Sequence, residues 1–545
     1  MTRIRRDLCV CAAALTFGLA LAGWYFRHAL NSDGVAYLRL GSYWAEGRCG
    51  LAVSGCWGPL LSWLVAALVK TGLPLLAAGR VAMAVTALVF FWGCVTVYRA
   101  FDLPEVWVRR GAWAAALAGV YWSVHVITPD LLVSGLIALA ASRVLQRHWL
   151  TNDRARLAAG ALWGLAYLAK AVAFPLGIFF ILLTSGRAIL RGHAGFRAGW
   201  RTAGMTFLAF GVVAAPWMLC LSLKYGRPVF STSARIVYAV AGPPDVERYH
   251  PATRTFHVPD PGRVTSWEDP STMAYRTWSP FENKQYAMYE ARLLLRNAAI
   301  CLWLLTTLNL LWPVMAAEWW GGWMRKGRNV FGGTTHPPEG KPARPEERGG
   351  WTRPLGLAGL LVLLYLPFVV RLTEQRYFYA AFPFLFTAAA LWLMKMAAGR
   401  PQQSNRILRA GGWLVMAGVV APVLLAVAFV RDSTKIAGEC AHDLAGRIEA
   451  AHLAGPIAGS GTLPGGRTGM YVAFLLNQPW YGDELQPTIE TVKASGARLF
   501  VVNRESTLAT TLARAPGVTD LDRKLFPNAE EAEKFPLIVF QVDSP

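Results

Sequence analysis

Long apolar stretches recur along the first 430 residues of the chain, separated by short polar connections. A helix needs about 20 mostly apolar residues to cross the hydrocarbon core of a bilayer. The stretches of this kind are Leu8–Phe26, Ala78–Tyr98, Gly111–Thr128, Leu131–Leu145, Leu157–Lys170, Val172–Ile189, Ala203–Leu223, Leu293–Ala316, Leu355–Val370, Tyr379–Met396 and Gly411–Val430. The pattern therefore predicts a polytopic α-helical membrane protein with about eleven transmembrane helices.

Basic residues gather in alternate connections between these stretches. Lys and Arg number 54 against 33 Asp and Glu, which gives a net charge of +21. Cationic loops stay on the cytoplasmic side of a membrane, so the N-terminus is expected to be cytoplasmic. The charge therefore sets topology in the inner (cytoplasmic) membrane. A nucleic-acid partner is excluded, because no basic stripe with interleaved aromatics lies outside the apolar stretches.

One further apolar stretch, Trp57–Leu73, reads as an interfacial helix. If it crossed the membrane, every later basic loop would lie on the outer side, against the positive-inside rule. Its Trp57, Trp63 and Lys70 are typical of a helix that lies along the interface. We therefore expect this stretch to stay at the outer surface.

The polar segments divide the chain into two parts. Residues 1–430 form the transmembrane part, with a first outer loop at 27–77, a large outer loop at 224–292 and a Pro- and Gly-rich inner loop at 318–353 that is predicted to be disordered. Residues 431–545 alternate helix-like and strand-like segments. They predict a small soluble α/β domain with a largely parallel sheet on the periplasmic or extracellular side.

Two acidic residues lie at the ends of predicted spans, where ionisable groups are costly and therefore candidates for function. Asp33 follows the first span and precedes an amphipathic juxtamembrane helix that contains Tyr37. Asp130 precedes the fourth span, in the sequence Thr128-Pro129-Asp130. In the alternative interpretation, Asn31, Ser32 or Asp33 only caps the juxtamembrane helix. Likewise, Thr128 could be the N-cap and Pro129 the first residue of the next helix, with Asp130 a favourable charge against the helix dipole. The predicted topology places both acids on the outer face.

Cationic residues are predicted at the same face. Lys170 lies at an outer junction, where it could snorkel or pair with a phosphate. Arg371 and Arg376 share a short outer turn with Glu374, which could neutralise one of them. Guanidinium binds phosphate bidentately, and a carboxylate can deprotonate a hydroxyl. The set suggests transfer of a sugar from a lipid phosphate to an acceptor at the outer surface. Asp33 and Asp130 are the candidate catalytic residues, and the candidate substrate-binding residues are Lys170, Arg376, Tyr37 and Arg371.

Metal ligands are not predicted. No Cys/His set has zinc spacing, although Cys49 and Cys56 share the first outer loop and could pair in an oxidising compartment. The proposed chemistry is compatible with a divalent cation but does not require one. No other cofactor is expected.

These residues resemble the GT-C glycosyltransferases of membranes, which include the protein O-mannosyltransferases, the lipid A aminoarabinose transferase and the bacterial Rgt-like group. The likeness covers roughly residues 8–430. It rests on Asp33-Gly34-x-x-Tyr37, on Pro59 and Arg80, on Thr128-Pro129-Asp130, and on the Tyr167–Pro175 segment with Lys170, joined later by Arg376-Tyr377 and Pro383.

The resemblance implies a lipid-linked sugar donor, usually on polyprenyl phosphate, and an outward-facing cavity without a nucleotide site. Asp33 would take the place of the family's catalytic acid and Asp130 that of its second acid, while Lys170 and Arg376 would contact phosphate. Two departures concern the acceptor: Gly34 stands where Glu is common, and Gly58 replaces a Lys found in relatives that modify lipid A. A glycan, a lipid or a protein remains open as acceptor.

Two other classes of function fit parts of the sequence. A transporter or lipid flippase would keep its polar site near the midplane, on broken helices in paired repeats, and no repeat is seen. A scaffold in envelope assembly would use residues 431–545 to bind glycan, and the outer acids would then serve only as helix caps.

Overall fold

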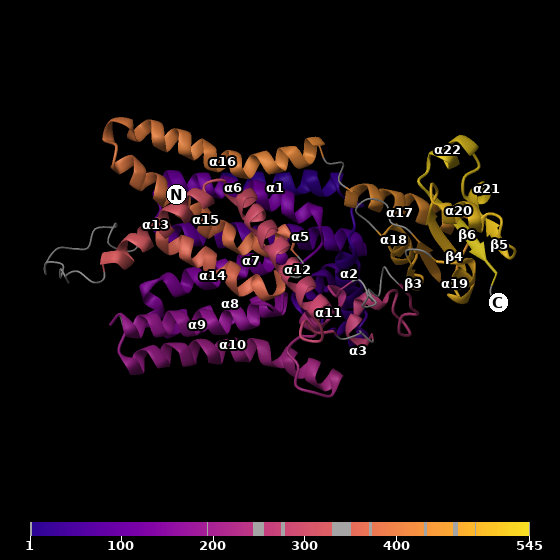
Figure 1. Ribbon diagram of the computed structural model, residues 1–545, viewed down its shortest axis with the longest axis horizontal. Helices are drawn as coiled ribbons and strands as arrows, with labels where there is room; N and C mark the ends of the chain where they lie inside the picture. Colours follow the sequence, from indigo (N-terminus) through magenta and orange to yellow (C-terminus); the bar gives the residue numbers. More distant parts are fainter. Residues whose placement is uncertain are drawn as a thin grey trace.

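The computed structural model describes residues 3–192, 194–243, 255–273, 278–329, 350–369, 373–429, 433–460, 467–484 and 487–543. Long helices form a bundle, and the C-terminal part of the chain forms a domain with a β-sheet at one end of it (Figure 1). The bundle helices are α1 (Arg3–Tyr25), α5 (Leu75–Ala100), α6 (Glu105–His125), α7 (Asp130–Leu145), α8 (Asp153–Ala169), α9 (Ala173–Leu190), α10 (Phe196–Tyr225), α12 (Lys284–Leu308), α13 (Trp312–Asn329), α14 (Thr352–Val369), α15 (Phe382–Ala398) and α16 (Ser404–Phe429).

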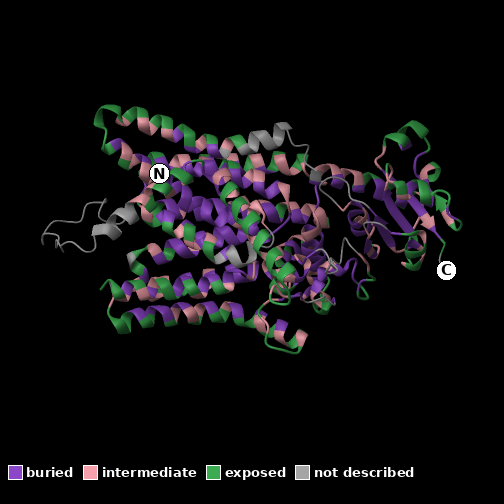
Figure 2. Cartoon of the chain, viewed as in Figure 1, coloured by how far each residue is buried: buried purple, intermediate pink, exposed green. Residues whose placement is uncertain are grey.

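Six helical segments in the described ranges are long and apolar enough to cross a membrane. They lie in α1, α5, α9, α10, α12 and the segment Gln375–Ala398 that contains α15. Large apolar side chains such as Leu190, Leu223 and Trp303 are exposed, and the outward-facing sides of several helices are exposed in Figure 2. Such an apolar surface requires lipid, so the chain is a multi-pass membrane protein. The total of eleven spans stays a prediction.

Small residues let the bundle helices approach closely. A Cβ on Gly135 of α7 would lie 2.7 Å from the Phe90 nitrogen of α5. A Cβ on Gly160 of α8 would lie 2.1 Å from the Thr206 carbonyl oxygen of α10. Membrane helices commonly pack through small residues in this way. The contacts fix α7 and α8, whose ends carry Asp130 and Lys170.

The first outer loop forms short helices that pack on each other. They are α2 (Ser32–Ala45), α3 (Cys49–Ala52) and α4 (Pro59–Lys70), and α2 contacts α4. The 12 residues of α4 span about 18 Å, less than the roughly 30 Å of a hydrocarbon core. The stretch Trp57–Leu73 therefore does not form a membrane-crossing helix.

Two boundary predictions were wrong. The expected single span Leu293–Ala316 is broken at Asn309, whose extended backbone ends α12. Its side chain donates to the Leu385 carbonyl oxygen and accepts from the Leu311 N–H, and Pro313 fits the first turn of α13. Helix α13 then continues to Asn329, so the start of the loop predicted to be disordered at 318–353 is helical. Residues 330–349 lie outside the described ranges.

The C-terminal part holds β2 (Ile457–Ser460), β3 (Trp480–Asp483), β4 (Leu499–Asn503), β5 (Val518–Asp520) and β6 (Leu537–Val542), with helices α17 (Ser433–Ala450), α18 (Thr468–Leu475), α19 (Ile489–Ala494), α20 (Thr507–Leu512), α21 (Asp522–Leu525) and α22 (Ala529–Lys534). The described strands are ordered β1-β3-β2-β4-β6-β5. β2 is parallel to β3 and β4, whereas the other three pairs are antiparallel. The prediction of a largely parallel sheet was wrong, because a short apolar run does not encode strand direction.

The large outer loop joins this sheet. Its strand β1 (Thr255–Phe256) pairs with β3 and forms one edge of the sheet, and the helix α11 (Ser233–Val240) lies earlier in the same loop. One apolar core also unites residues of α2 and α4 with residues of α17, α18 and β2. The C-terminal part is therefore packed against the first outer loop, beside the N-terminus of α2.

The docking of α17 depends on a glycine. A Cβ on Gly438 would lie 1.9 Å from the His28 carbonyl oxygen, whereas a Cβ on Gly446 of the same helix meets nothing within 4 Å. We expect Gly438→Val to lower the stability of the folded protein by about 1–3 kcal/mol through overpacking. Thermal unfolding in detergent measures this. Gly446→Val controls for helix propensity, and equal melting temperatures in the two variants would contradict the prediction.

Candidate active site

The candidate residues come from four separate elements. Asp33 lies in the first turn of α2, and Asp130 is the first residue of α7. Lys170 ends α8 with an extended backbone, and Arg376 lies in the 3-10 helix η5 (Gln375–Ala381). Arg80 of α5 donates hydrogen bonds to the carbonyl oxygens of Ala29 and Val124, so it ties together the segments that precede the two acids.

Ion pairs bring the four residues into one cluster. Lys170 Nζ lies 2.5 Å from Asp130 Oδ1, and Arg376 Nη1 lies 2.9 Å from Asp33 Oδ2. Arg376 Nε lies 2.6 Å from Glu374 Oε2 and 3.9 Å from Asp130 Oδ2. Arg376 is therefore the shared centre, with three carboxylates around it.

The cluster is graded in burial. The side chain of Asp130 is 2% exposed, that of Arg376 12%, that of Asp33 20% and that of Lys170 26%. A buried carboxylate is stable only when it is paired, which explains why Asp130 has two cations nearby. Asp33 is the more accessible of the two aspartates.

Aromatic side chains line the cluster. Tyr37 is buried, with its ring centre 5.2 Å from that of Trp57, and Trp57 lies 5.3 Å from Trp267. Burial, together with the charges of Asp130 and Asp33, raises the pKa of Tyr37 well above its ordinary value. Its phenol therefore stays protonated.

The predicted site residues that the structure describes are thus brought together. Asp33, Asp130, Lys170, Arg376 and Tyr37 share one site. Glu374 pairs with Arg376, which confirms that it neutralises one of the two arginines. Arg371 lies outside the described residues.

The local alternatives can also be compared with the structure. Of the three candidate caps of α2, Asn31 occupies the N-cap position, without a side-chain cap hydrogen bond, and Asp33 lies inside the first turn. Pro129, rather than Thr128, is the N-cap of α7. Helix ends shift by a residue easily, since flanking contacts choose between adjacent caps.

Cysteines and metal ligands add little to the site. Cys49 and Cys56 are both free thiols in this structure. Among the residues described, no three or more His, Cys, Asp or Glu side chains are grouped as a metal site would require.

Sequence reasoning missed Trp267. Its indole Nε1 donates to Asp33 Oδ1 over 3.3 Å, across 234 positions of sequence. A local signal existed: Thr265 and Glu268 form a capping box around Trp267 in the 3-10 turn η2 (Ser266–Glu268). The pattern marks an ordered turn in the large outer loop, but it does not say what the turn covers.

No family profile and no curated protein matches the chain by sequence. Solved structures do match its fold. The crystal structure of ArnT from Cupriavidus metallidurans bound to undecaprenyl phosphate is 15% identical with a TM-score of 0.52, and covers 98% of this chain and 97% of that chain. The apo form of the same protein is 14% identical with a TM-score of 0.50, and the match covers 98% of this chain and 98% of that chain. A third match is the archaeal oligosaccharyltransferase AglB from Archaeoglobus fulgidus, solved with an inhibitory peptide and a dolichol-phosphate. It is 9% identical with a TM-score of 0.49, and the match covers 96% of this chain and 72% of that chain.

The chain has the fold of the GT-C membrane glycosyltransferases. This confirms the resemblance drawn from the sequence. The likeness to ArnT spans 98% of the chain, and therefore extends beyond residues 8–430, where the motifs of the GT-C fold were found.

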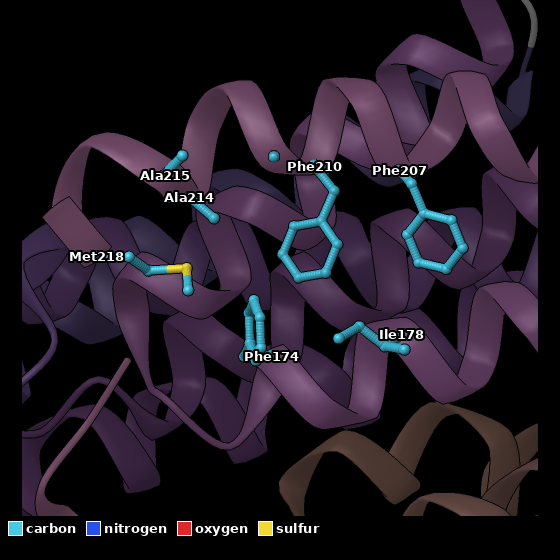
Figure 3. Close-up of a pocket in the computed structure, with 8 residues that line it drawn as sticks. Phe174, Ile178, Phe207, Phe210, Ala214, Ala215 and Met218 are labelled. Atoms are coloured by element: carbon cyan, nitrogen blue, oxygen red, sulfur yellow. The ribbon is translucent and has the colours of Figure 1, made fainter. Parts of the chain in front are cut away.

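An apolar pocket of about 260 Å³ opens between α9 and α10 (Figure 3). Phe174, on the first turn of α9, lies four positions after Lys170, so the pocket begins close to the charged cluster. The lining residues are Phe174, Ile178, Phe207, Phe210, Gly211, Ala214, Ala215 and Met218. The chain thus places an apolar pocket between two of its apolar helices, four positions along the chain from Lys170.

The pair of Asp130 and Lys170 yields a test of the cluster. Lys170→Met leaves the buried carboxylate with the more distant Arg376, so we expect a loss of about 3 kcal/mol in the free energy of unfolding. Thermal unfolding in detergent is the measurement. The double variant Asp130→Asn/Lys170→Met removes the unpaired charge and should recover part of the loss. A double variant no more stable than Lys170→Met would refute the pairing.

Proposed function

We propose that the protein transfers a sugar from a polyprenyl-phosphate-linked donor to an acceptor hydroxyl at the outer face of the cytoplasmic membrane. The observation that carries this proposal is the single cluster of Asp33, Asp130, Lys170 and Arg376. Such a cluster offers cations for a phosphate and an accessible carboxylate for a proton. The GT-C fold supports it, and the similar ArnT was solved with undecaprenyl phosphate.

Lys170 and Arg376 would bind the donor phosphate. Arg376 already lies among carboxylates, 2.9 Å from Asp33 and 2.6 Å from Glu374. A phosphate offers the same oxygen ligands with more charge, so it can compete with these carboxylates for the guanidinium. Lys170 is 26% exposed and remains reachable while paired with Asp130. Asp130 then fixes the ammonium group of Lys170 at the edge of the site.

Asp33 would act as the general base. It takes the proton of the acceptor hydroxyl while the hydroxyl oxygen bonds to the anomeric carbon of the sugar. The bond from that carbon to the phosphate oxygen breaks, and its electron pair leaves with the polyprenyl phosphate. Lys170 and Arg376 stabilise the charge that develops on the leaving phosphate. Attack from the face opposite the phosphate inverts the anomeric configuration.

The apolar pocket between α9 and α10 would take part of the polyprenyl chain. Its first lining residue, Phe174, lies four positions after Lys170 in the chain, and all of its lining side chains are apolar. A lipid whose phosphate lies on Lys170 could therefore extend into it. Burial of each methylene contributes about 0.8 kcal/mol. The sugar and the acceptor are left open by this arrangement.

Asp33→Asn tests the proposed base. The variant keeps the shape of the side chain but cannot accept the acceptor proton, so we expect transfer to fall about 100-fold or more. A strain lacking the gene is complemented with either form, and envelope glycans and lipids are followed by mass spectrometry. Equal protein levels in the membrane are the control. Full transfer by Asp33→Asn would refute the proposal.

Gly211→Trp tests the pocket. A Cβ at Gly211 meets nothing within 4 Å, so the indole can occupy the pocket without displacing the backbone. We expect the Kd of the purified protein for undecaprenyl phosphate to rise about tenfold, the equivalent of roughly two lost methylene contacts. Gly359→Trp is the matched control, because Gly359 lies on α14, is not among the residues that line the pocket and is equally open. Equal Kd values for both variants would contradict the prediction.

A further inference from the structure

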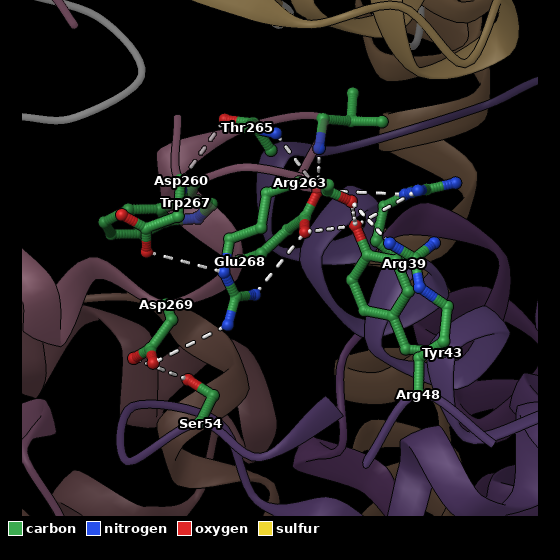
Figure 4. Close-up of polar contacts among 12 residues, drawn as sticks. Arg39, Tyr43, Arg48, Ser54, Asp260, Arg263, Thr265, Trp267, Glu268 and Asp269 are labelled. Carbon is green, nitrogen blue, oxygen red and sulfur yellow. Dashed lines mark hydrogen bonds and ion pairs between the residues drawn. The ribbon is translucent and has the colours of Figure 1, made fainter. Parts of the chain in front are cut away.

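A turn of the large outer loop is fixed by two buried carboxylates. We name Thr265–Asp269 the acidic turn; Figure 4 shows its polar contacts. Glu268 is 0% exposed, and its carboxylate accepts from the backbone N–H of Val264 at 2.9 Å and of Thr265 at 3.0 Å. The Tyr43 hydroxyl of α2 donates to the same carboxylate at 2.8 Å.

Two arginines neutralise Glu268 in this enclosed setting. Arg39 of α2 lies 3.7 Å from it and Arg263 lies 3.5 Å from it. Burial nevertheless raises the pKa of Glu268 above its ordinary value. A carboxylate this enclosed needs all of its partners, so the turn holds a defined position on α2.

Asp269 anchors the other end of the acidic turn. Its side chain, 0% exposed, lies 2.5 Å from Lys224 Nζ and accepts from the Tyr225 hydroxyl at 2.9 Å, both from the end of α10. Ser54 of the first outer loop donates to it at 3.3 Å. The acidic turn is thus bound to α2, to α10 and to Ser54 of the first outer loop.

The C-terminal sheet holds the same segment from another side. The backbone N–H of Trp480 in β3 donates to the Val264 carbonyl oxygen at 2.6 Å. The His257 N–H donates to the Tyr481 carbonyl oxygen at 2.6 Å, and His257 Nδ1 lies 2.9 Å from the Ser266 hydroxyl. Movement of the C-terminal part would therefore be transmitted to the acidic turn.

Trp267 carries this rigidity to Asp33. It directly precedes the two anchored carboxylates in the chain, and its carbonyl oxygen accepts from the Trp57 indole at 2.9 Å. Its own indole N–H donates to Asp33 Oδ1 at 3.3 Å, while Arg376 contacts Oδ2. The two oxygens of Asp33 are thus held by a neutral donor from the outer loop and by a cation.

We propose that Trp267 is a positioning residue for Asp33, and that the acidic turn exists to hold its indole in place. The inference rests on the proposed function. When a donor phosphate draws Arg376 away, the carboxylate of Asp33 loses its cationic contact and would rotate freely about χ2. The neutral indole N–H, fixed by the anchored turn, keeps the carboxylate oriented toward the acceptor hydroxyl. A base misplaced by an ångström loses much of its effect.

Trp267→Phe tests this role because it removes the donor but keeps an aromatic ring against Trp57. Complemented cells should form the glycosylated product at about one tenth of the wild-type initial rate. The purified variant should bind undecaprenyl phosphate with unchanged Kd, because the phosphate ligands are intact. Trp278→Phe is the matched control: Trp278 lies in the same outer loop and donates to the Tyr238 carbonyl oxygen, away from the site.

Glu268→Gln is the second variant, which loosens the turn without changing Trp267. It should slow product formation in the same direction, again at unchanged lipid Kd. Full activity of both variants would overturn the positioning role, as would a loss of lipid binding equal to the loss of transfer. Asp33→Asn distinguishes a failure of the positioning role from a failure of the proposed function. If Asp33→Asn is inactive while Trp267→Phe and Glu268→Gln are fully active, only the role of Trp267 falls; if Asp33→Asn is active, the proposed function falls.

Discussion

The buried carboxylate of Asp130 is the constraint on which the site depends. Left unpaired at the end of a membrane helix, it would cost several kcal/mol, so Lys170 must reach it and Arg376 must stay near. Lys170 can do so because α8 ends there in an extended residue. Arg376 in turn draws in Asp33 from α2. A single desolvated charge thereby aligns four elements that are distant in sequence.

Pairing of buried charges also explains how the outer region is held together. Glu268 and Asp269 are as buried as Asp130. Glu268 pairs with a cation and a hydroxyl of α2, and Asp269 with a cation and a hydroxyl of α10 and a hydroxyl of the first outer loop. These contacts pack the large outer loop against α2, and β1 extends that loop into the C-terminal sheet. The outer loops and the C-terminal part are therefore one layer, packed beside the charged cluster.

Apolar and charged parts of the site have separate tasks in the proposed reaction. The pocket between α9 and α10 belongs to the membrane-spanning helices and suits a lipid chain. The charged cluster lies at their ends, where a phosphate and a polar acceptor can meet. The chain shares its fold with ArnT at only 15% sequence identity, because helix packing through small and apolar residues tolerates substitution more readily than a paired buried charge does.

The sequence by itself determined the membrane class and the identity of Asp33, Asp130, Lys170 and Arg376 as candidates, and it predicts the side on which the basic loops lie. Hydrophobic run length and unpaired charges near lipid are local properties, so one chain suffices to read them. Tertiary structure alone decided which charges meet, the break at Asn309, the mixed strand directions and the contact of Trp267 with Asp33. These depend on partners far away in sequence, and no local pattern encodes the partner.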